Sequence, residues 1–460
     1  MMHSKKTSFF RSTVMVFSTL GLLCTASCQT TKTDPWEDYS TPAESAPSQL
    51  PNTQEDLSGI ETYEIGTPDV PAASLTTNRE MTKVALLVPL SGDKAHIGQS
   101  LMNAAQMAMF DGNMPNFEIL PKDTLGTAEG ARAAAQEAVR DGAKIVLGPL
   151  FSHSVQAAKP ITDRYNVPLI AFSTDWRLAD QNTYIMGFLP FTQVQRILEY
   201  SAGQGYHNMG VFSPQNNYGQ AIVSSYLRIA PQLGLSMQNM ASFSPTDTNI
   251  SPLLREFSLY DERVEELNQL IRPLEMRLES NPNDVQAKFE LEQYKNMDTF
   301  GPPPFDAVLL PVGGEQARAI ANLLSHYDLD PDEVRRLGTG LWDDDALATE
   351  QNLDGAWFAA PSPDLRKNFE LRYKSIYGTD APRLSTLAYD ATALAMLLTN
   401  MGNRFDRTAI TNANGFAGID GIFRFRQNGL IERGLAVLEY RNGEIVVIDP
   451  APNTFQRYAY

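Results

Sequence analysis

Val84-Ala-Leu-Leu-Val-Pro-Leu90 is a continuous apolar run of strand length, as expected for a strand buried on both faces of a parallel sheet. Ser91 and Gly92 end the run, and apolar residues then recur at helical spacing over 97–110. The same alternation continues to position 175, with further strands predicted at 117–120, 145–147 and 168–172 and a helix at 127–140. This stretch predicts an α/β fold with a parallel sheet.

Small polar residues follow the strands of this sheet. Ser91 follows the first strand, Ser152 closes the Gly148-Pro-Leu-Phe-Ser152 turn, and Ser173-Thr-Asp175 follows the strand at 168–172. Ligands of open α/β sheets bind at the carboxyl ends of the strands, so these residues are candidate ligand contacts. Ser173 and Thr174 are equally suited to capping the next helix.

Composition narrows the class of protein. A chain of 460 residues is long enough for two or three domains. The net charge of −17 argues against a nucleic-acid partner, because phosphate binding needs clustered Lys and Arg. Five histidines and two cysteines show no spacing typical of a metal site.

The first 27 residues have the features of a signal peptide. Lys5, Lys6 and Arg11 precede an apolar run at 14–23 that is too short to span a bilayer, which needs about 20 residues. Small residues come just before Cys28, so the segment resembles a bacterial lipoprotein signal with Cys28 as the lipid attachment site. A secretory signal cleaved without lipid addition is the alternative.

Two further segments differ in composition from the α/β frame. Residues 28–80 are dense in Pro, Ser, Thr, Asp and Glu and predict a disordered tether to a folded domain at 81–452. Residues 258–300 carry apolar residues at helical intervals among many charges and predict an inserted helical hairpin. The hairpin either packs its apolar stripe on its own domain or presents it to a protein partner.

The remaining pattern continues the α/β order. Strands are predicted at 207–212, 236–243, 306–311 and 355–359, and helices at 192–201, 220–233, 315–327, 365–377 and 384–400. Near the C-terminus, 423–425 and 435–440 predict an antiparallel hairpin.

Several motifs in register resemble the leucine/isoleucine/valine-binding proteins over about 83–450. They are the run from Lys83 to Gly92, Gly148-Pro-Leu-Phe-Ser152, the run from Pro168 to Thr174, Asn217-Tyr-Gly219, and Gly421-Ile-Phe-Arg-Phe425 with Gly429. The resemblance implies a type I periplasmic-binding-protein fold, with two three-layer α/β lobes of parallel sheets joined by a three-strand hinge. It also implies that lobe 1 comprises about 83–193 and 362–433, and lobe 2 about 194–361 and 434–450.

The same resemblance implies a ligand site between the lobes. Ser152 stands where a hydroxyl holds an amino acid's carboxylate, and Tyr218 stands where an aromatic residue lines the second lobe. The full set of candidate ligand-binding residues is Ser91, Ser152, Ser173, Thr174, Asp175, Tyr218 and Trp342.

This sequence departs from the family's site at two places. Gly340-Leu-Trp342 occupies the place of an acidic partner for the ligand's ammonium, and Asp343 would have to shift register to replace it. Burying an ammonium without a counter-charge costs several kcal/mol. Asp175 would repel a carboxylate where the family has threonine. An amino-acid ligand is therefore in doubt.

The lipid anchor, tether and inserted helices together resemble the lipoprotein activators of bifunctional penicillin-binding proteins. That resemblance implies a protein-contacting domain at the periplasmic side of the outer membrane of a Gram-negative bacterium. The partner would be a penicillin-binding protein, acting in peptidoglycan synthesis. The alternative is a receptor that delivers amino acids or related small molecules to an ABC permease.

No enzymatic motif stands out. There is no Gly-x-Ser-x-Gly elbow and no phosphate loop of the Gly-Lys-Ser/Thr type. Asp343-Asp-Asp345 could bind a cation, but a solvated helix start explains it better. We therefore expect no catalytic residue, metal or cofactor.

Overall fold

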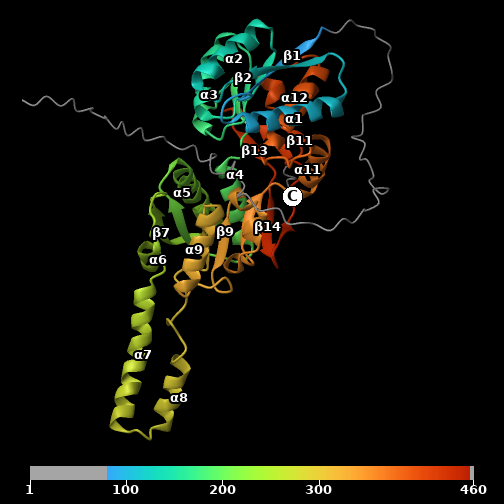
Figure 1. The fold of residues 1–460 in the computed structure, drawn as a ribbon. Coiled ribbons are helices and arrows are strands. Elements are labelled where there is room, and N and C mark those ends of the chain that lie inside the picture. Colours follow the sequence, from blue (N-terminus) through green and yellow to red (C-terminus); the bar gives the residue numbers. More distant parts are fainter. Residues whose placement is uncertain (1–79, 456–460) are drawn as a thin grey trace, which may run out of the picture.

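The computed structural model describes residues 80–455. The predicted signal peptide, Cys28 and nearly all of the predicted tether lie outside the described residues. Within them the chain builds two α/β lobes, each on its own sheet (Figure 1). This architecture confirms the fold class predicted from the sequence.

Lobe 1 is built on a five-stranded parallel sheet of order β2-β1-β3-β4-β5. The strands are β1 (Thr82–Val88), β2 (Phe117–Asp123), β3 (Ile145–Leu147), β4 (Leu169–Ala171) and β5 (Thr183–Ile185). Residues 84–88 of β1 are fully buried, as an apolar strand in the middle of a parallel sheet requires.

Four helices cover the sheet of lobe 1 in two packed pairs, one on either side (Figure 1). One pair is α1 (Ala95–Gly112) with α12 (Ser385–Asn400), and the other is α2 (Ala128–Arg140) with α3 (Ser152–Arg164). The Thr127 side chain accepts a hydrogen bond from the Gly130 amide and so caps α2. Helix α11 (Pro363–Tyr377) also packs on α1 and buries Phe369 and Tyr373 in this core.

Lobe 2 is built on a seven-stranded sheet of order β15-β14-β10-β9-β8-β6-β7. The strands are β6 (Asn208–Pro214), β7 (Ser236–Phe243), β8 (Ala307–Leu309), β9 (Arg335–Gly338), β10 (Trp357–Ala360), β14 (Ala436–Arg441) and β15 (Glu444–Asp449). Its longer helices are α4 (Pro190–Gly203), α5 (Asn217–Ile229) and α9 (Gly314–His326). The last two strands run antiparallel to their neighbours and close one edge.

The predicted pairing of 423–425 with 435–440 is wrong. Strand β12 (Gly421–Phe425) pairs with β11 (Phe416–Gly418) and β13 (Ile431–Arg433), whereas β14 pairs with β10 and β15. Gly429, at a φ of 80°, lets the chain turn back early enough for β12 to pair with β13. The segment after β13 then crosses to the other lobe.

Three short segments connect the lobes. They are residues 186–189 between β5 and α4, residues 361–362 between β10 and α11, and residues 434–435 between β13 and β14. Because so few residues cross, side-chain contacts near these segments determine how the lobes sit against each other.

The insert leaves lobe 2 as a helical hairpin that extends away from both sheets (Figure 1). It comprises α7 (Tyr260–Ser280) and α8 (Val285–Tyr294) and follows the short helix α6 (Ser251–Phe257). At its base the buried Arg263 donates to the Asp328 carbonyl at 2.9 Å, and the Phe300 amide donates to the Arg263 carbonyl at 3.1 Å. The hairpin is therefore anchored where it begins and ends.

Gly98 provides a test of how closely α1 packs on the end of β1. A Cβ at Gly98 would lie 1.8 Å from the Pro89 carbonyl oxygen. Gly98→Ala should therefore lower the free energy of unfolding by about 1–3 kcal/mol, measured from the urea midpoint. Gly203→Ala in α4 is the matched control, because nothing lies within 4 Å of its Cβ, and it should cost no stability. Equal effects would contradict this packing.

Candidate functional site

A small cavity lies between the lobes, next to the crossing segments. It is lined by Phe188, Gln193, Tyr218, Gly340, Leu341, Asp343, Pro361 and Arg383. Its volume, taken as the space open to the centre of a water molecule, is about 20 Å³. One water needs roughly 10–15 Å³ on this measure, so in this conformation the cavity has room for one or two waters and not for an amino acid.

Asp343 closes this cavity by bridging the lobes. It follows the 3₁₀ turn Gly340–Trp342 of lobe 2, and its side chain is only 3% exposed. One carboxylate oxygen accepts from Nη2 of Arg366 at 2.7 Å, and the other accepts from Nε of Arg383 at 3.1 Å. Arg366 lies in the first turn of α11 and Arg383 just before α12, both in lobe 1. A single buried carboxylate therefore joins the two lobes.

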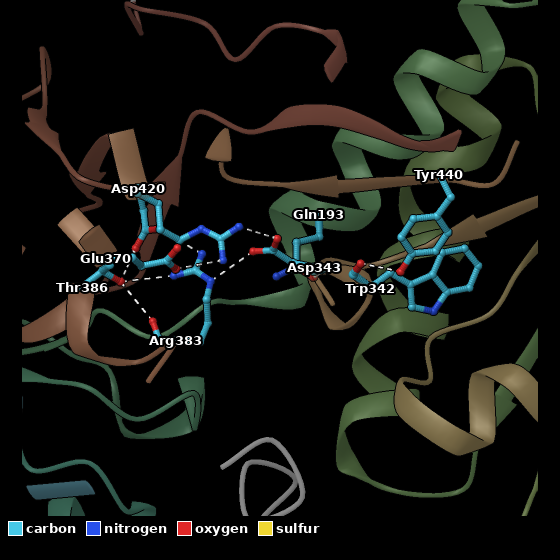
Figure 2. A network of polar contacts seen from close by, with 10 residues as sticks. Gln193, Trp342, Asp343, Glu370, Arg383, Thr386, Asp420 and Tyr440 are labelled. Atoms are coloured by element: carbon cyan, nitrogen blue, oxygen red, sulfur yellow. Dashed lines mark hydrogen bonds and ion pairs between the residues drawn. The ribbon is translucent and has the colours of Figure 1, made fainter. Parts of the chain in front are cut away.

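The bridge continues into lobe 1 through Asp420. This fully buried carboxylate lies 2.9 Å from Nη2 of Arg383 and accepts from the Thr386 hydroxyl at 2.6 Å (Figure 2). Burial alone would raise the pKa of Asp420, but Arg383, Arg433 and the Thr386 hydroxyl together hold that pKa below its usual value. Asp420 is therefore a fixed negative charge that positions Arg383.

Asp390 is a second buried carboxyl of lobe 1, close to Asp420. Burial, together with repulsion from Asp420, raises the pKa of Asp390 to about 7, although Arg433 opposes the shift. Its Oδ1 accepts from the Ile419 amide at 2.7 Å, while Oδ2 has no hydrogen-bond partner among the described residues. A neutral carboxyl fits this environment better than a second carboxylate.

Phe188, on a crossing segment, contacts two guanidinium groups. The guanidinium carbon of Arg383 is 4.3 Å from the ring centroid, and that of Arg433 is 4.9 Å away. Arg433 also donates to the Met186 carbonyl at 3.0 Å. Cation–π contacts of this kind contribute about 0.5–2 kcal/mol each, so the crossing segment is held to the charged cluster.

Only Tyr218, of the seven candidate ligand residues, lines this cavity. Its phenol donates to the Thr339 hydroxyl at 2.8 Å, and burial raises the pKa of Tyr218 above its usual value. Ser152 begins α3 and is partly buried. The remaining polar candidates lie at the ends of β1 and β4.

Three of those candidates make local contacts. Ser91 is exposed and donates to the Asp123 carboxylate at 2.6 Å. The Ser173 hydroxyl accepts from the Asp175 amide, and the Asp175 carboxylate pairs with Arg177 at 2.8 Å. These contacts shape the turn that contains Thr174, and Arg177 offsets the negative charge of Asp175.

Trp342 is not a cavity residue. It is fully buried in the core of lobe 2, and its indole N–H donates to the Val312 carbonyl at 2.7 Å. Gly338 leaves the room it needs, since a Cβ there would lie 2.1 Å from the indole. The candidate role of Trp342 as a ligand contact is therefore wrong, because its ring packs inward against Phe358 and Tyr440.

Neither a spanning helix nor a metal-binding cluster was found in the part of the chain that the structure describes. None of the helices between residues 80 and 455 is long and apolar enough to cross a membrane. The same residues contain no group of three or more His, Cys, Asp or Glu side chains that could hold a metal ion. Asp344, one of the acidic run, caps the short helix α10 (Asp345–Ala348) through the Ala346 amide.

The raised pKa of Asp390 predicts a pH dependence of stability. The folded state keeps a proton on Asp390 up to about pH 7, whereas the unfolded state loses it near pH 4, so this group favours folding more as the pH falls through 7. Asp390→Asn should flatten the dependence of the urea midpoint on pH between about 5 and 8. An unchanged slope would show that Asp390 is ionised in the folded protein.

Comparison with known proteins places the fold. A family model described as "Periplasmic binding protein" matches residues 82–261. One curated relative, the uncharacterized protein RP748 of Rickettsia prowazekii (strain Madrid E), is 22% identical over 216 residues. That match covers 47% of this chain and 57% of the relative, so it spans little more than half of the relative's length.

Solved structures share the architecture at low identity. A putative branched-chain amino acid ABC transporter protein from Rhodospirillum rubrum is 17% identical, with a TM-score of 0.63, and the match covers 80% of this chain and 99% of that one. A Rhodopseudomonas palustris BisB5 solute-binding protein, solved with 3,4-dihydroxybenzoic acid, is 18% identical at a TM-score of 0.54, with 80% and 96% covered.

A leucine-binding protein from Thermotoga maritima MSB8 is 18% identical at a TM-score of 0.52, and the match covers 80% of this chain and 97% of that one. At such identities the structures show the fold alone. Residues 82–261 are therefore similar to the periplasmic binding protein family, and the two lobes together have the type I periplasmic-binding-protein fold.

Proposed function

We propose that this protein is a non-enzymatic, lipid-anchored periplasmic protein that docks a bifunctional penicillin-binding protein and activates it in peptidoglycan synthesis. Cys28 would carry the lipid that holds the domain at the outer membrane of a Gram-negative bacterium, and residues 28–80 would be the tether. The observation that carries the proposal is the projecting hairpin of α7 and α8.

The hairpin exposes large apolar side chains near its far end. Met276, Val285 and Phe289 are 59%, 78% and 62% exposed. Leu267 and Leu274 are buried, so one part of the apolar stripe packs within the insert while another part faces outward. Exposed apolar groups clustered on a projecting element are typical of protein–protein contact sites.

Ion pairs keep the end of the hairpin in shape. Arg277 of α7 lies 3.0 Å from Asp284 and 3.7 Å from Glu290 of α8. Because the helices are fixed to each other there and the base is anchored through Arg263, the exposed apolar groups sit on a preorganised support.

The interlobe cavity gives independent support. A receptor for free amino acids needs a carboxylate for the ligand's ammonium, but the two guanidinium groups already neutralise Asp343. The cavity also lacks the volume for such a ligand. In this conformation the domain is better suited to contacting a protein than to holding an amino acid.

Shortening the hairpin tests the docking role. Replacing residues 266–296 with a short Gly/Ser linker keeps Arg263 and Thr299, whose contacts with Asp328 anchor the base. We expect binding to the purified bifunctional penicillin-binding protein of the same bacterium to be lost, with the thermal unfolding midpoint of the lobes retained.

Point variants test whether the exposed apolar side chains of the hairpin make the contact. Val285→Ser combined with Phe289→Ser should weaken binding at least tenfold, since each buried apolar side chain contributes about 1.5–3 kcal/mol. Gln293→Ser, at another exposed position of α8, is the matched control and should bind like the original protein. Full binding by the shortened protein would refute the hairpin's role.

The second candidate is a solute receptor of an ABC permease. It is favoured by the family match and by neighbours of the same fold whose descriptions are those of ABC transporter solute-binding proteins. Such a receptor would open its lobes, admit a small molecule and close around it.

A thermal-shift screen of amino acids and aromatic carboxylates separates the two candidates. A ligand at a hundredfold excess over its dissociation constant stabilises the folded state by about 2.7 kcal/mol. For the docking role we expect no saturable stabilisation of the unmodified protein by these solutes. A saturable shift that Ser152→Ala abolishes would instead favour transport.

A further inference from the structure

We propose that Arg366 and Arg383 form an anion site for a small carboxylate, and that Asp343 is its built-in competitor. In the closed form the Asp343 carboxylate occupies the site. When it leaves, a free carboxylate with an apolar body takes its place. This inference rests on the interlobe cluster and does not depend on the docking function.

The geometry is that of a carboxylate held by two guanidinium groups. Arg366 reaches one oxygen of Asp343 at 2.7 Å and Arg383 reaches the other at 3.1 Å. The arginine side chains are each 14% exposed and the carboxylate is 3% exposed, so all three charges are largely removed from water. Charge-assisted contacts in such surroundings are strong and select for a carboxylate.

The positive charges around Arg366 and Arg383 require a nearby anion. Three guanidinium groups meet here, from Arg366, Arg383 and Arg433, while Asp420 is the one carboxylate whose pKa is held low. Burial and repulsion from Asp420 raise the pKa of Asp390 to about 7, so this carboxyl is a weak counter-charge near neutral pH. Glu370 lies 3.5 Å from Nη1 of Arg366, a longer contact than the one that Asp343 makes with Arg366. Without Asp343, Arg366 keeps only its contact with Glu370 and Arg383 keeps Asp420, so the two guanidinium groups lose the carboxylate that they share. Removing one partner of a buried ion pair costs several kcal/mol.

Asp343 and the arginines belong to different lobes, so the competitor leaves when the lobes separate. The arginines remain on lobe 1, supported by Asp420 and by the Phe188 ring under Arg383. Leu341 and Pro361 also line the cavity. An aromatic or aliphatic carboxylate therefore matches the site better than an inorganic anion.

Competition from Asp343 explains why the unmodified chain would bind an external carboxylate only weakly. A tethered carboxylate has an effective concentration of about millimolar or more, and it lowers the apparent affinity for an external one. Removing the Asp343 charge should expose the site while leaving the arginines in place.

The test is titration of the purified full chain with sodium benzoate, followed by calorimetry and thermal shift. Asp343→Asn should bind benzoate at least tenfold more tightly than the original protein, and more tightly than it binds acetate or chloride. Asp345→Asn removes an exposed carboxylate two residues away, and this control should behave like the original protein.

Adding Arg366→Gln to Asp343→Asn should abolish the gain. Retention of tight benzoate binding in that double variant would overturn the proposal, as would an Asp343→Asn protein no better than the original. Equal responses to benzoate, acetate and chloride would mean simple charge screening and would also overturn it. If Asp343→Asn does not fold alone, benzoate-dependent recovery of folded protein supports the site, and no recovery with benzoate refutes it.

Discussion

The Asp343 carboxylate between two arginines is the contact on which the arrangement of the lobes depends. Among residues 80–455, three short segments cross between the sheets, so the backbone alone leaves the lobes free to move about them. A carboxylate that is 3% exposed must be neutralised where it lies. That requirement holds Arg366 of α11 and Arg383, just before α12, against the residue that follows the 3₁₀ turn Gly340–Trp342, and the cavity beside them is small.

The same requirement extends into lobe 1. Arg383 meets Asp343 on one side and Asp420 on the other, and Phe188 packs against both Arg383 and Arg433. Buried charges, the Asp390 carboxyl with its raised pKa, and a crossing segment thus form one connected cluster. A substitution at any member changes the electrostatic energy of the others, because little solvent is present to screen their charges.

The hairpin is separate from this cluster in both position and chemistry. It is attached to lobe 2 at its base and extends away from the cleft, with exposed apolar groups near its end. A domain can therefore keep the frame of a solute receptor while presenting a contact surface elsewhere. Proteins that share a fold can differ in function, because the function depends on the local sites.

Much of the fold follows from local patterns in the sequence. The strands at 145–147 and 236–243 were predicted with the bounds that the structure has, and the bounds of the helices at 127–140 and 384–400 differ by at most one residue. These elements could be predicted because a buried strand or an amphipathic helix has a characteristic pattern of apolar residues along consecutive positions. β5 was not predicted, because Thr183-Tyr-Ile185 lacks the continuous aliphatic run that marks the equally short strand at 145–147.

Pairing and burial depended on distant contacts. The apolar pattern of the strand at 435–440 does not specify its partner strand. In the structure this strand pairs with β10 and β15 of the lobe 2 sheet. Trp342 stands beside cavity residues in sequence yet turns into the core. Arg366 and Arg383 lie 23 and 40 residues from Asp343 and in the other lobe, with no local motif. Sequence periodicity reports which residues are buried in an element, whereas the partner of a buried charge is set by how the two lobes close.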